Sequence, residues 1–154
     1  QARGGLLTPE QAIESLSKGF ERGRKDTRNA EITLGELSPL MRQEHAFMRV
    51  YWTGALYFLQ ADIKLRRETG GKNPLTLDDV LREFGACCLT RNQRWSGLDI
   101  AREFDRIAAT ELFVRLYLEF EQTNAIPDYA MALDAPEMDM IFAPRPAAKA
   151  LPVQ

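Results

Sequence analysis

Few side chains in this chain have types and spacings that could do chemistry: one histidine, two adjacent cysteines, and an acid and an arginine one helical turn apart. His45 is the only histidine, and Glu44-His45 has no partner histidine four residues later. Protein zinc sites use three or four nitrogen, sulfur or oxygen ligands, so one imidazole cannot hold the metal. We therefore expect His45 to be a surface or hydrogen-bonded histidine, and we expect no metal or cofactor in this chain.

The two cysteines, Cys87 and Cys88, are neighbours in a segment with helical periodicity. Successive side chains on a helix point about 100° apart, so a disulfide between them is not expected. The sequence favours two reduced cysteines, with Cys88 continuing an apolar stripe. Two cysteines also make no disulfide framework, and they do not decide the compartment.

Asp62 and Arg66 lie four residues apart in the most hydrophobic helical pattern of the chain. This spacing allows an ion pair on one helix face. Buried pairs mostly serve packing and register, so a structural pair is favoured over a substrate contact.

The elements that must position these residues are helices. Five capping patterns predict where helices start: Thr8-Pro9, Ser38-Pro39, Thr76, Ser96 and Thr110. We also expect a long central helix that runs from Tyr51 to the Gly70-Gly71 turn. Strand-like alternation is almost absent. The expected fold is all-α, with roughly six helices packed as antiparallel neighbours.

Beyond Asn124 the helical periodicity is lost. Four prolines punctuate the last part of the chain: Pro136, Pro144, Pro146 and Pro152. We expect a helical domain over residues 1–130, followed by an irregular, partly disordered tail over residues 131–154.

The composition excludes two kinds of partner. Of the 154 residues, 45% are hydrophobic and 27% are charged, and the formal net charge is -2. A chain without a basic field is a poor partner for nucleic acid or an anionic membrane, so we expect neither. No apolar run approaches the roughly 20 residues needed to cross a bilayer.

A longer pattern extends from Tyr51 to Leu81. It joins Tyr51-Trp52-Thr53-Gly54-Ala55 to the arginines Arg66-Arg67, a Gly-Gly turn and the helix start Leu77-Asp78-Asp79-Val80. The pattern resembles the segment downstream of the zinc site in gluzincin metallopeptidases, most closely the glycyl-aminopeptidase branch. The resemblance covers residues from about Leu6 to Tyr129, but the His-Glu-x-x-His zinc helix of that family is absent.

The resemblance implies one catalytic residue. Tyr51 and Gly54 match the family's Tyr-x-x-Gly element, whose phenol donates a hydrogen bond to the oxyanion formed during peptide hydrolysis. A slip of one position would place Trp52 there instead. The alternative for Tyr51 is an aromatic residue that anchors the start of a helix.

Two functions follow. The first is the C-terminal helical domain of a zinc-dependent aminopeptidase-like protein, inactive alone, with zinc and the peptide substrate bound when an upstream catalytic domain of the same polypeptide is present. The second is a non-catalytic helical interaction module. An apolar face that normally meets the catalytic part could also support a homodimer. A third possibility is an unrelated all-α domain whose helix caps match those of the gluzincin family by coincidence.

Overall fold

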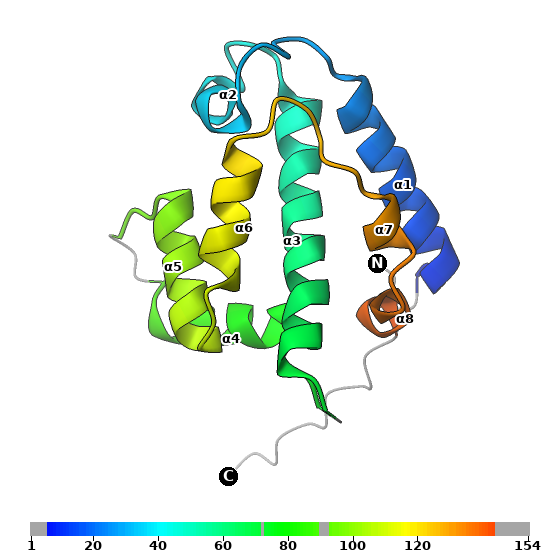
Figure 1. Ribbon diagram of the computed structural model, residues 1–154, viewed down its shortest axis with the longest axis vertical. Helices are drawn as coiled ribbons and strands as arrows, with labels where there is room; N and C mark the ends of the chain where they lie inside the picture. Colours follow the sequence, from blue (N-terminus) through cyan, green and yellow to red (C-terminus); the bar gives the residue numbers. More distant parts are fainter. Residues whose placement is uncertain (1–5, 72, 90–92, 144–154) are drawn as a thin grey trace.

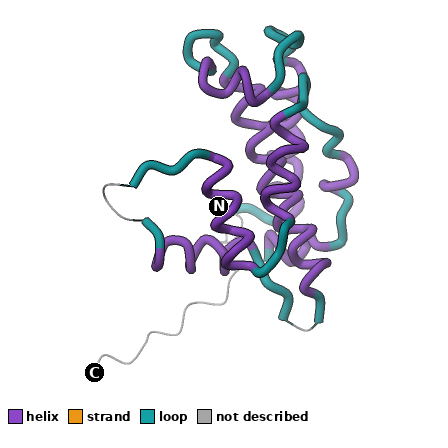
Figure 2. The backbone as a smooth tube through the Cα atoms, turned by 60° about the vertical axis from the view of Figure 1, so that its left-hand side comes forward, coloured by secondary structure: helices purple, strands orange, loops and turns teal. Residues whose placement is uncertain are grey.

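The computed structural model describes residues 6–71, 73–89 and 93–143. In these ranges the chain forms helices and loops and no strand (Figure 2), which confirms the all-α prediction. The helices are α1 (Pro9–Lys25), α2 (Leu34–Leu40), α3 (Phe47–Thr69), α4 (Leu77–Cys87), α5 (Gly97–Ala108), α6 (Leu112–Glu121), α7 (Ala130–Leu133) and α8 (Glu137–Phe142). Among the described helices, none is both long and apolar enough to cross a membrane.

The long helix α3 stands at the centre of the bundle (Figure 1), with α1 on one side and α6 on the other. Helix α5 packs on the far side of α6, so the order across the molecule is α1, α3, α6, α5, and neighbours run in opposite directions (Figure 1). Helix α4 crosses near the C-terminal end of α3, and α2 lies near the opposite end. The predicted packing of antiparallel neighbours is therefore present.

Three predicted helix starts are confirmed by their caps. The hydroxyls of Thr8, Thr76 and Ser96 accept hydrogen bonds from the backbone N–H three residues later, at Gln11, Asp79 and Asp99. For Thr8 and Thr76 the side chain at that third position also bonds back to the cap residue, which completes a capping box. These local bonds explain why the starts could be found in the sequence.

The predicted start at Ser38-Pro39 is wrong. Helix α2 begins earlier, at Leu34, because Thr33 and Glu36 form a capping box of their own. Pro39 lies in the last turn of this short helix, and the Ser38 hydroxyl donates to the Leu34 carbonyl instead of capping a new helix. A separate turn follows before α3 begins at Phe47.

The segment after residue 130 differs from the predicted irregular tail. It contains the short helices α7 and α8, which pack along α1 and α3. Ala132, Ala135, Met138 and Ile141 are buried, at intervals of three residues. Burial of this stripe explains why the segment is ordered despite Pro136. Pro144, Pro146 and Pro152 lie outside the described residues.

The core joins α3 to its neighbours through large apolar side chains. Phe20 of α1, Leu56 of α3, and Phe113 and Leu116 of α6 are almost completely buried. Tyr57 of α3 is also buried, and its hydroxyl donates to the Phe113 carbonyl at 3.0 Å. Burial raises the pKa of Tyr57, so this phenol is neutral at physiological pH.

The start of α6 depends on a residue in the preceding helix. Thr110, the expected cap, accepts a hydrogen bond from the Leu112 N–H at 3.2 Å. The buried Asp105 carboxylate accepts two more, from the backbone N–H groups of Phe113 and Val114, both at 2.8 Å. An acid at this position also interacts favourably with the positive end of the helix dipole.

Candidate functional site

Tyr51 lies in the second turn of α3 with its side chain directed outwards. It is 64% exposed, and its ring meets that of Trp52 edge-on, with the centroids 5.1 Å apart. Its hydroxyl forms no hydrogen bond with another described residue. The phenol is therefore available to a group outside the described bundle.

Trp52, the alternative position for the catalytic residue, serves packing. Its ring lies against α1, 5.9 Å from the Phe20 ring, and the Arg22 guanidinium sits 5.2 Å from the ring centroid. A Cβ added at Gly19 would overlap the six-membered ring of Trp52, and one at Gly23 would lie 2.8 Å from the Trp52 Cβ. These two glycines make room for the indole, so Trp52 fixes how α1 packs on α3.

Arg49 fixes the start of α3, two residues before Tyr51. Its guanidinium is buried, with an exposed fraction of 1%, and it donates to three carbonyls: Asn29 at 2.7 Å, Ile32 at 2.8 Å and Thr123 at 3.1 Å. Two of the acceptors belong to the loop between α1 and α2, and the third follows α6. Burial lowers the pKa of Arg49, although an arginine remains charged.

Sequence reasoning missed Arg49. An arginine between Met48 and Val50 carries no local signal of burial, because its acceptors are backbone carbonyls far away in the chain. Only the tertiary arrangement shows that this cation ties two loops to the helix that presents Tyr51.

An apolar cavity of about 380 Å³ lies between α2, α3, α5 and α6. Most of its walls are hydrocarbon or aromatic; among the lining residues are Pro39, Val50, Gly54, Phe58, Ile100 and Tyr117. Apart from the two neighbours of Gly54 and the adjoining backbone of α3, no atom of the described residues lies within 4 Å of the position that a Cβ on Gly54 would occupy. Glycine therefore leaves this part of the α3 surface open.

Tyr51 belongs to an aromatic stripe on α3 that reaches this cavity. Phe47, Tyr51, Gly54 and Phe58 are spaced at i, i+4, i+7 and i+11, which places them on one helix face. Phe47 is 41% exposed and Phe58 is 40% exposed, and Gly54 and Phe58 line the cavity. We call Phe47, Tyr51 and Phe58 the aromatic stripe.

One acidic side chain, Glu121, is among the residues that line the cavity, beside Tyr117. Burial raises the pKa of Tyr117, and the nearby Glu121 charge raises it further. Both lining tyrosines, Tyr57 and Tyr117, are therefore neutral at physiological pH. This environment suits an apolar group better than an anion.

Asp62 and Arg66 form the predicted ion pair, with Arg66 Nη2 3.1 Å from Asp62 Oδ2, and both side chains are buried. Asp62 Oδ1 also accepts a hydrogen bond from the Leu77 N–H at 2.7 Å, which joins α3 to the start of α4. Arg67 is paired with Glu137 of α8 at 2.7 Å. These contacts support a structural role for both arginines.

His45 is exposed and lies in the turn before α3, with a positive φ of 52°. Within the described residues, the group of side chains close enough to hold a metal ion is Cys87, Cys88 and Glu103, which does not include His45. The placement agrees with the expectation of a surface histidine.

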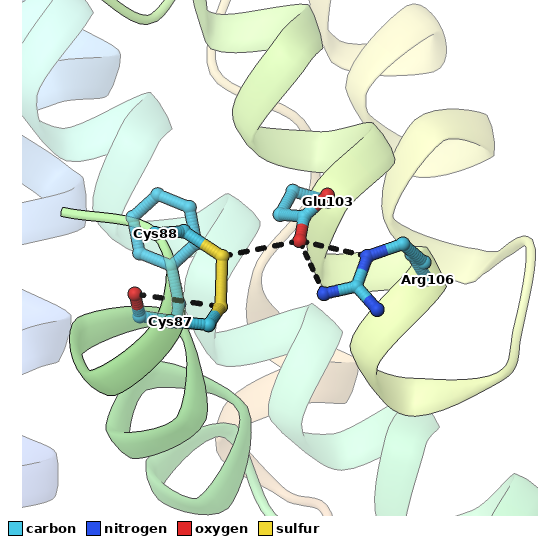
Figure 3. Close-up of a disulfide and its surroundings, with 5 residues drawn as sticks. Cys87, Cys88, Glu103 and Arg106 are labelled. Carbon is cyan, nitrogen blue, oxygen red and sulfur yellow. Dashed lines mark hydrogen bonds and ion pairs between the residues drawn. A yellow bond between two sulfur atoms is a disulfide. The ribbon is translucent and has the colours of Figure 1, made fainter. Parts of the chain in front are cut away.

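The prediction for the cysteines is wrong: Cys87 and Cys88 form a disulfide (Figure 3). The helical argument does not apply because α4 ends at Cys87, and Cys88 is the C-cap residue with a non-helical φ of -127°. The 100° rotation between successive side chains holds only inside a helix. Cys88 still packs against the core, as the apolar stripe predicted.

Comparisons with known protein families, with curated proteins and with solved structures found no match for this chain. The gluzincin resemblance therefore rests on the sequence alone, and mainly on the residues from Tyr51 to Leu81.

Proposed function

We propose that this chain is the C-terminal helical domain of a zinc-dependent aminopeptidase-like metallopeptidase, and that Tyr51 stabilises the transition state of peptide hydrolysis. The observation that carries the proposal is the exposed phenol of Tyr51, which has no hydrogen-bond partner among the described residues. Tyr51 lies on the same face of α3 as Gly54 and Phe58, which line the apolar cavity. A buried or hydrogen-bonded phenol would have been unable to meet a substrate.

Peptide hydrolysis requires a neutral hydrogen-bond donor close to the carbonyl oxygen on which negative charge develops. The neutral phenol O–H of a tyrosine can donate a hydrogen bond to an oxyanion. Removal of one such donor costs about 10²- to 10³-fold in turnover. Arg49 and Trp52 would hold the helix that presents the phenol, because one fixes its start and the other its packing on α1.

The residues of this chain do not fit the catalytic zinc, since His45 is an isolated exposed histidine. The metal ligands would belong to an upstream catalytic domain of the same polypeptide. That domain would face the aromatic stripe, and the substrate peptide would lie between the two parts.

The test uses the full-length polypeptide and an aminoacyl anilide substrate. We expect Tyr51→Phe to lower kcat by about 10²- to 10³-fold with little change in KM, since the lost bond forms mainly in the transition state. Tyr129→Phe is the matched control: it also removes one phenol hydroxyl, but that hydroxyl bonds Glu21 at 3.0 Å. The control should keep wild-type turnover.

Two results would contradict the proposal. One is wild-type turnover by Tyr51→Phe in the full-length protein. The other is hydrolysis by the 154-residue chain alone, with added zinc, that depends on Tyr51. Reading the coding sequence upstream of Gln1 gives an earlier check, because the proposal requires a His-Glu-x-x-His helix followed by a glutamate.

The alternative function is a non-catalytic interaction module. The exposed aromatic stripe and the adjoining cavity favour it, because both could accept apolar groups of a partner. A coding sequence without the zinc helix would favour this function. Sedimentation of the isolated chain would then show whether a second copy, as a homodimer, covers the stripe.

A further inference from the structure

The Cys87–Cys88 disulfide lies against a carboxylate from another helix. Cys87 ends α4, and the Cys88 Sγ is 3.2 Å from Oε1 of Glu103 on α5 (Figure 3). One ligand atom from each of these three residues falls within 4.8 Å of the other two. The packing of α4 on α5 brings them together, across 15 residues of sequence.

These groups match the ligands of a thiophilic cation once the disulfide is reduced. Zinc binds thiolates at about 2.3 Å and carboxylate oxygens at about 2.0–2.2 Å, so ligand atoms around a tetrahedral ion lie on the order of 3.5–4 Å apart. The sulfurs must separate from bonding distance to that spacing. Cys87 is exposed and Cys88 lies outside the helix, which leaves both side chains room to turn.

We propose that reduction of the Cys87–Cys88 disulfide creates a binding site for a soft divalent cation, Zn²⁺ or Cd²⁺, with the two thiolates and the Glu103 carboxylate as ligands. A phosphine reductant breaks the S–S bond, takes up one oxygen from water to become the phosphine oxide, and leaves two thiols. The cation then displaces both thiol protons into solvent. The disulfide form offers no thiolate and does not bind the cation.

Arg106 prepares the carboxylate for this role. Its Nε and Nη2 both donate to Oε1 of Glu103, with the Nε bond at 2.8 Å, while no described residue donates to Oε2. These bonds lower the pKa of Glu103, so the carboxyl is ionised at neutral pH. Two thiolates and one carboxylate carry three negative charges, which a divalent cation and the Arg106 guanidinium neutralise together. Because Cys87 is exposed, water can complete the coordination.

The test compares the oxidised and reduced forms of the whole chain. The protein is reduced with a phosphine, freed of reductant under anaerobic conditions and titrated with Cd²⁺, with the thiolate-to-cadmium charge-transfer absorbance as the signal. A competing chromophoric chelator gives the dissociation constant. We expect one Cd²⁺ per reduced chain and none per oxidised chain.

Variants separate coordination from general charge. Cys88→Ser should abolish the signal, and Glu103→Gln should weaken Cd²⁺ binding by at least about tenfold, as for the loss of a metal-site contact. Glu83→Gln is the matched control: it removes the same charge from the exposed face of α4, near Arg106, but Glu83 is outside the ligand group. It should change the dissociation constant less than about twofold, since exposed charges are well screened.

The proposal is overturned if the reduced chain does not bind Cd²⁺, if the oxidised chain binds it equally, or if Glu103→Gln binds as tightly as the wild type. Circular dichroism of each variant checks its fold. Should Cys88→Ser fail to fold, the comparison of oxidised with reduced wild type and the Glu103→Gln titration still decide the matter. None of these results depends on whether Tyr51 is catalytic.

Discussion

Replacement of Arg49 by methionine would remove the cation that joins two loops to the start of α3. Methionine retains an unbranched apolar stem but donates no hydrogen bond. The change therefore deletes the three bonds to Asn29, Ile32 and Thr123 and leaves the surrounding backbone in place.

The cost can be worked from the partners that each carbonyl would keep. The Asn29 carbonyl still accepts from the Ile32 N–H at 3.2 Å, and the Thr123 carbonyl from the Leu34 N–H at 2.8 Å. The Ile32 carbonyl has no other donor among the described residues. The unsatisfied Ile32 carbonyl costs about 1–3 kcal/mol, and the Asn29 and Thr123 carbonyls, which each lose one of two bonds, cost about 0.5–1 kcal/mol apiece. We therefore expect the free energy of unfolding to fall by about 3 kcal/mol.

The assay is urea unfolding followed by circular dichroism. With a slope of about 2 kcal/mol per molar urea, a loss of 3 kcal/mol lowers the midpoint by about 1.5 M. Arg49→Lys keeps the charge but not the planar fork, so it should fall between wild type and Arg49→Met. Arg102→Met is the control, because Arg102 is largely exposed and paired with the exposed Asp99; it should cost less than about 0.5 kcal/mol.

An Arg49→Met midpoint that matches the Arg102→Met midpoint would refute this reasoning. It would mean that water replaces the guanidinium at all three carbonyls without cost, and that the buried cation does not hold the start of α3.

Three further predictions concern stability. Gly54→Ala should raise the free energy of unfolding by about 0.5–1 kcal/mol, because an added Cβ has open space and alanine is the better helix former. Gly19→Ala should lower it by about 1–3 kcal/mol, because the added Cβ overlaps the Trp52 ring; urea midpoints in the opposite order would contradict both. Hydrogen bonds from Arg24 lower the pKa of Glu21 from 4.5 to about 2. A carboxyl whose pKa is depressed in the folded state contributes stability above pH 4.5, and this stability is lost as the pH falls towards 2. The free energy of unfolding of Glu21→Gln, measured by urea unfolding at each pH, should therefore fall less steeply than that of the wild type between pH 4.5 and 2. An unchanged slope would refute the role of the Glu21–Arg24 hydrogen bonds.

The helices that the sequence predicted well have local start signals. Thr8, Thr76 and Ser96 each bond an amide three residues away, so the evidence for the helix start lies within four residues of sequence. The wrong start at Ser38-Pro39 was also predicted from a local signal. Thr33 and Glu36 carry an equivalent local signal, and it is this capping box that starts α2 at Leu34.

The remaining differences depend on contacts between distant segments. Ala132, Met138 and Ile141 form a regular apolar stripe, yet only packing against α1 and α3 orders the described segment around Pro136. The Cys87–Cys88 disulfide depends on where α4 ends, and helix ends are the least certain feature of a periodicity pattern. For the candidate site, Tyr51 stays a prediction from the resemblance, and the Asp62–Arg66 ion pair is confirmed. The cavity could not be predicted, because it requires four helices to be in place.

The contact between the last described helices and the first one bears on how the protein matures during synthesis. Tyr129 packs its ring 5.2 Å from that of Phe20 and donates its hydroxyl to Glu21, across 108 residues of chain. A nascent polypeptide therefore leaves the ribosome with the inner side of α1 only partly covered until α7 and α8 emerge. Chaperones that recognise hydrophobic segments would have their longest opportunity to bind at α1, and premature termination before Tyr129 would leave that opportunity permanently open.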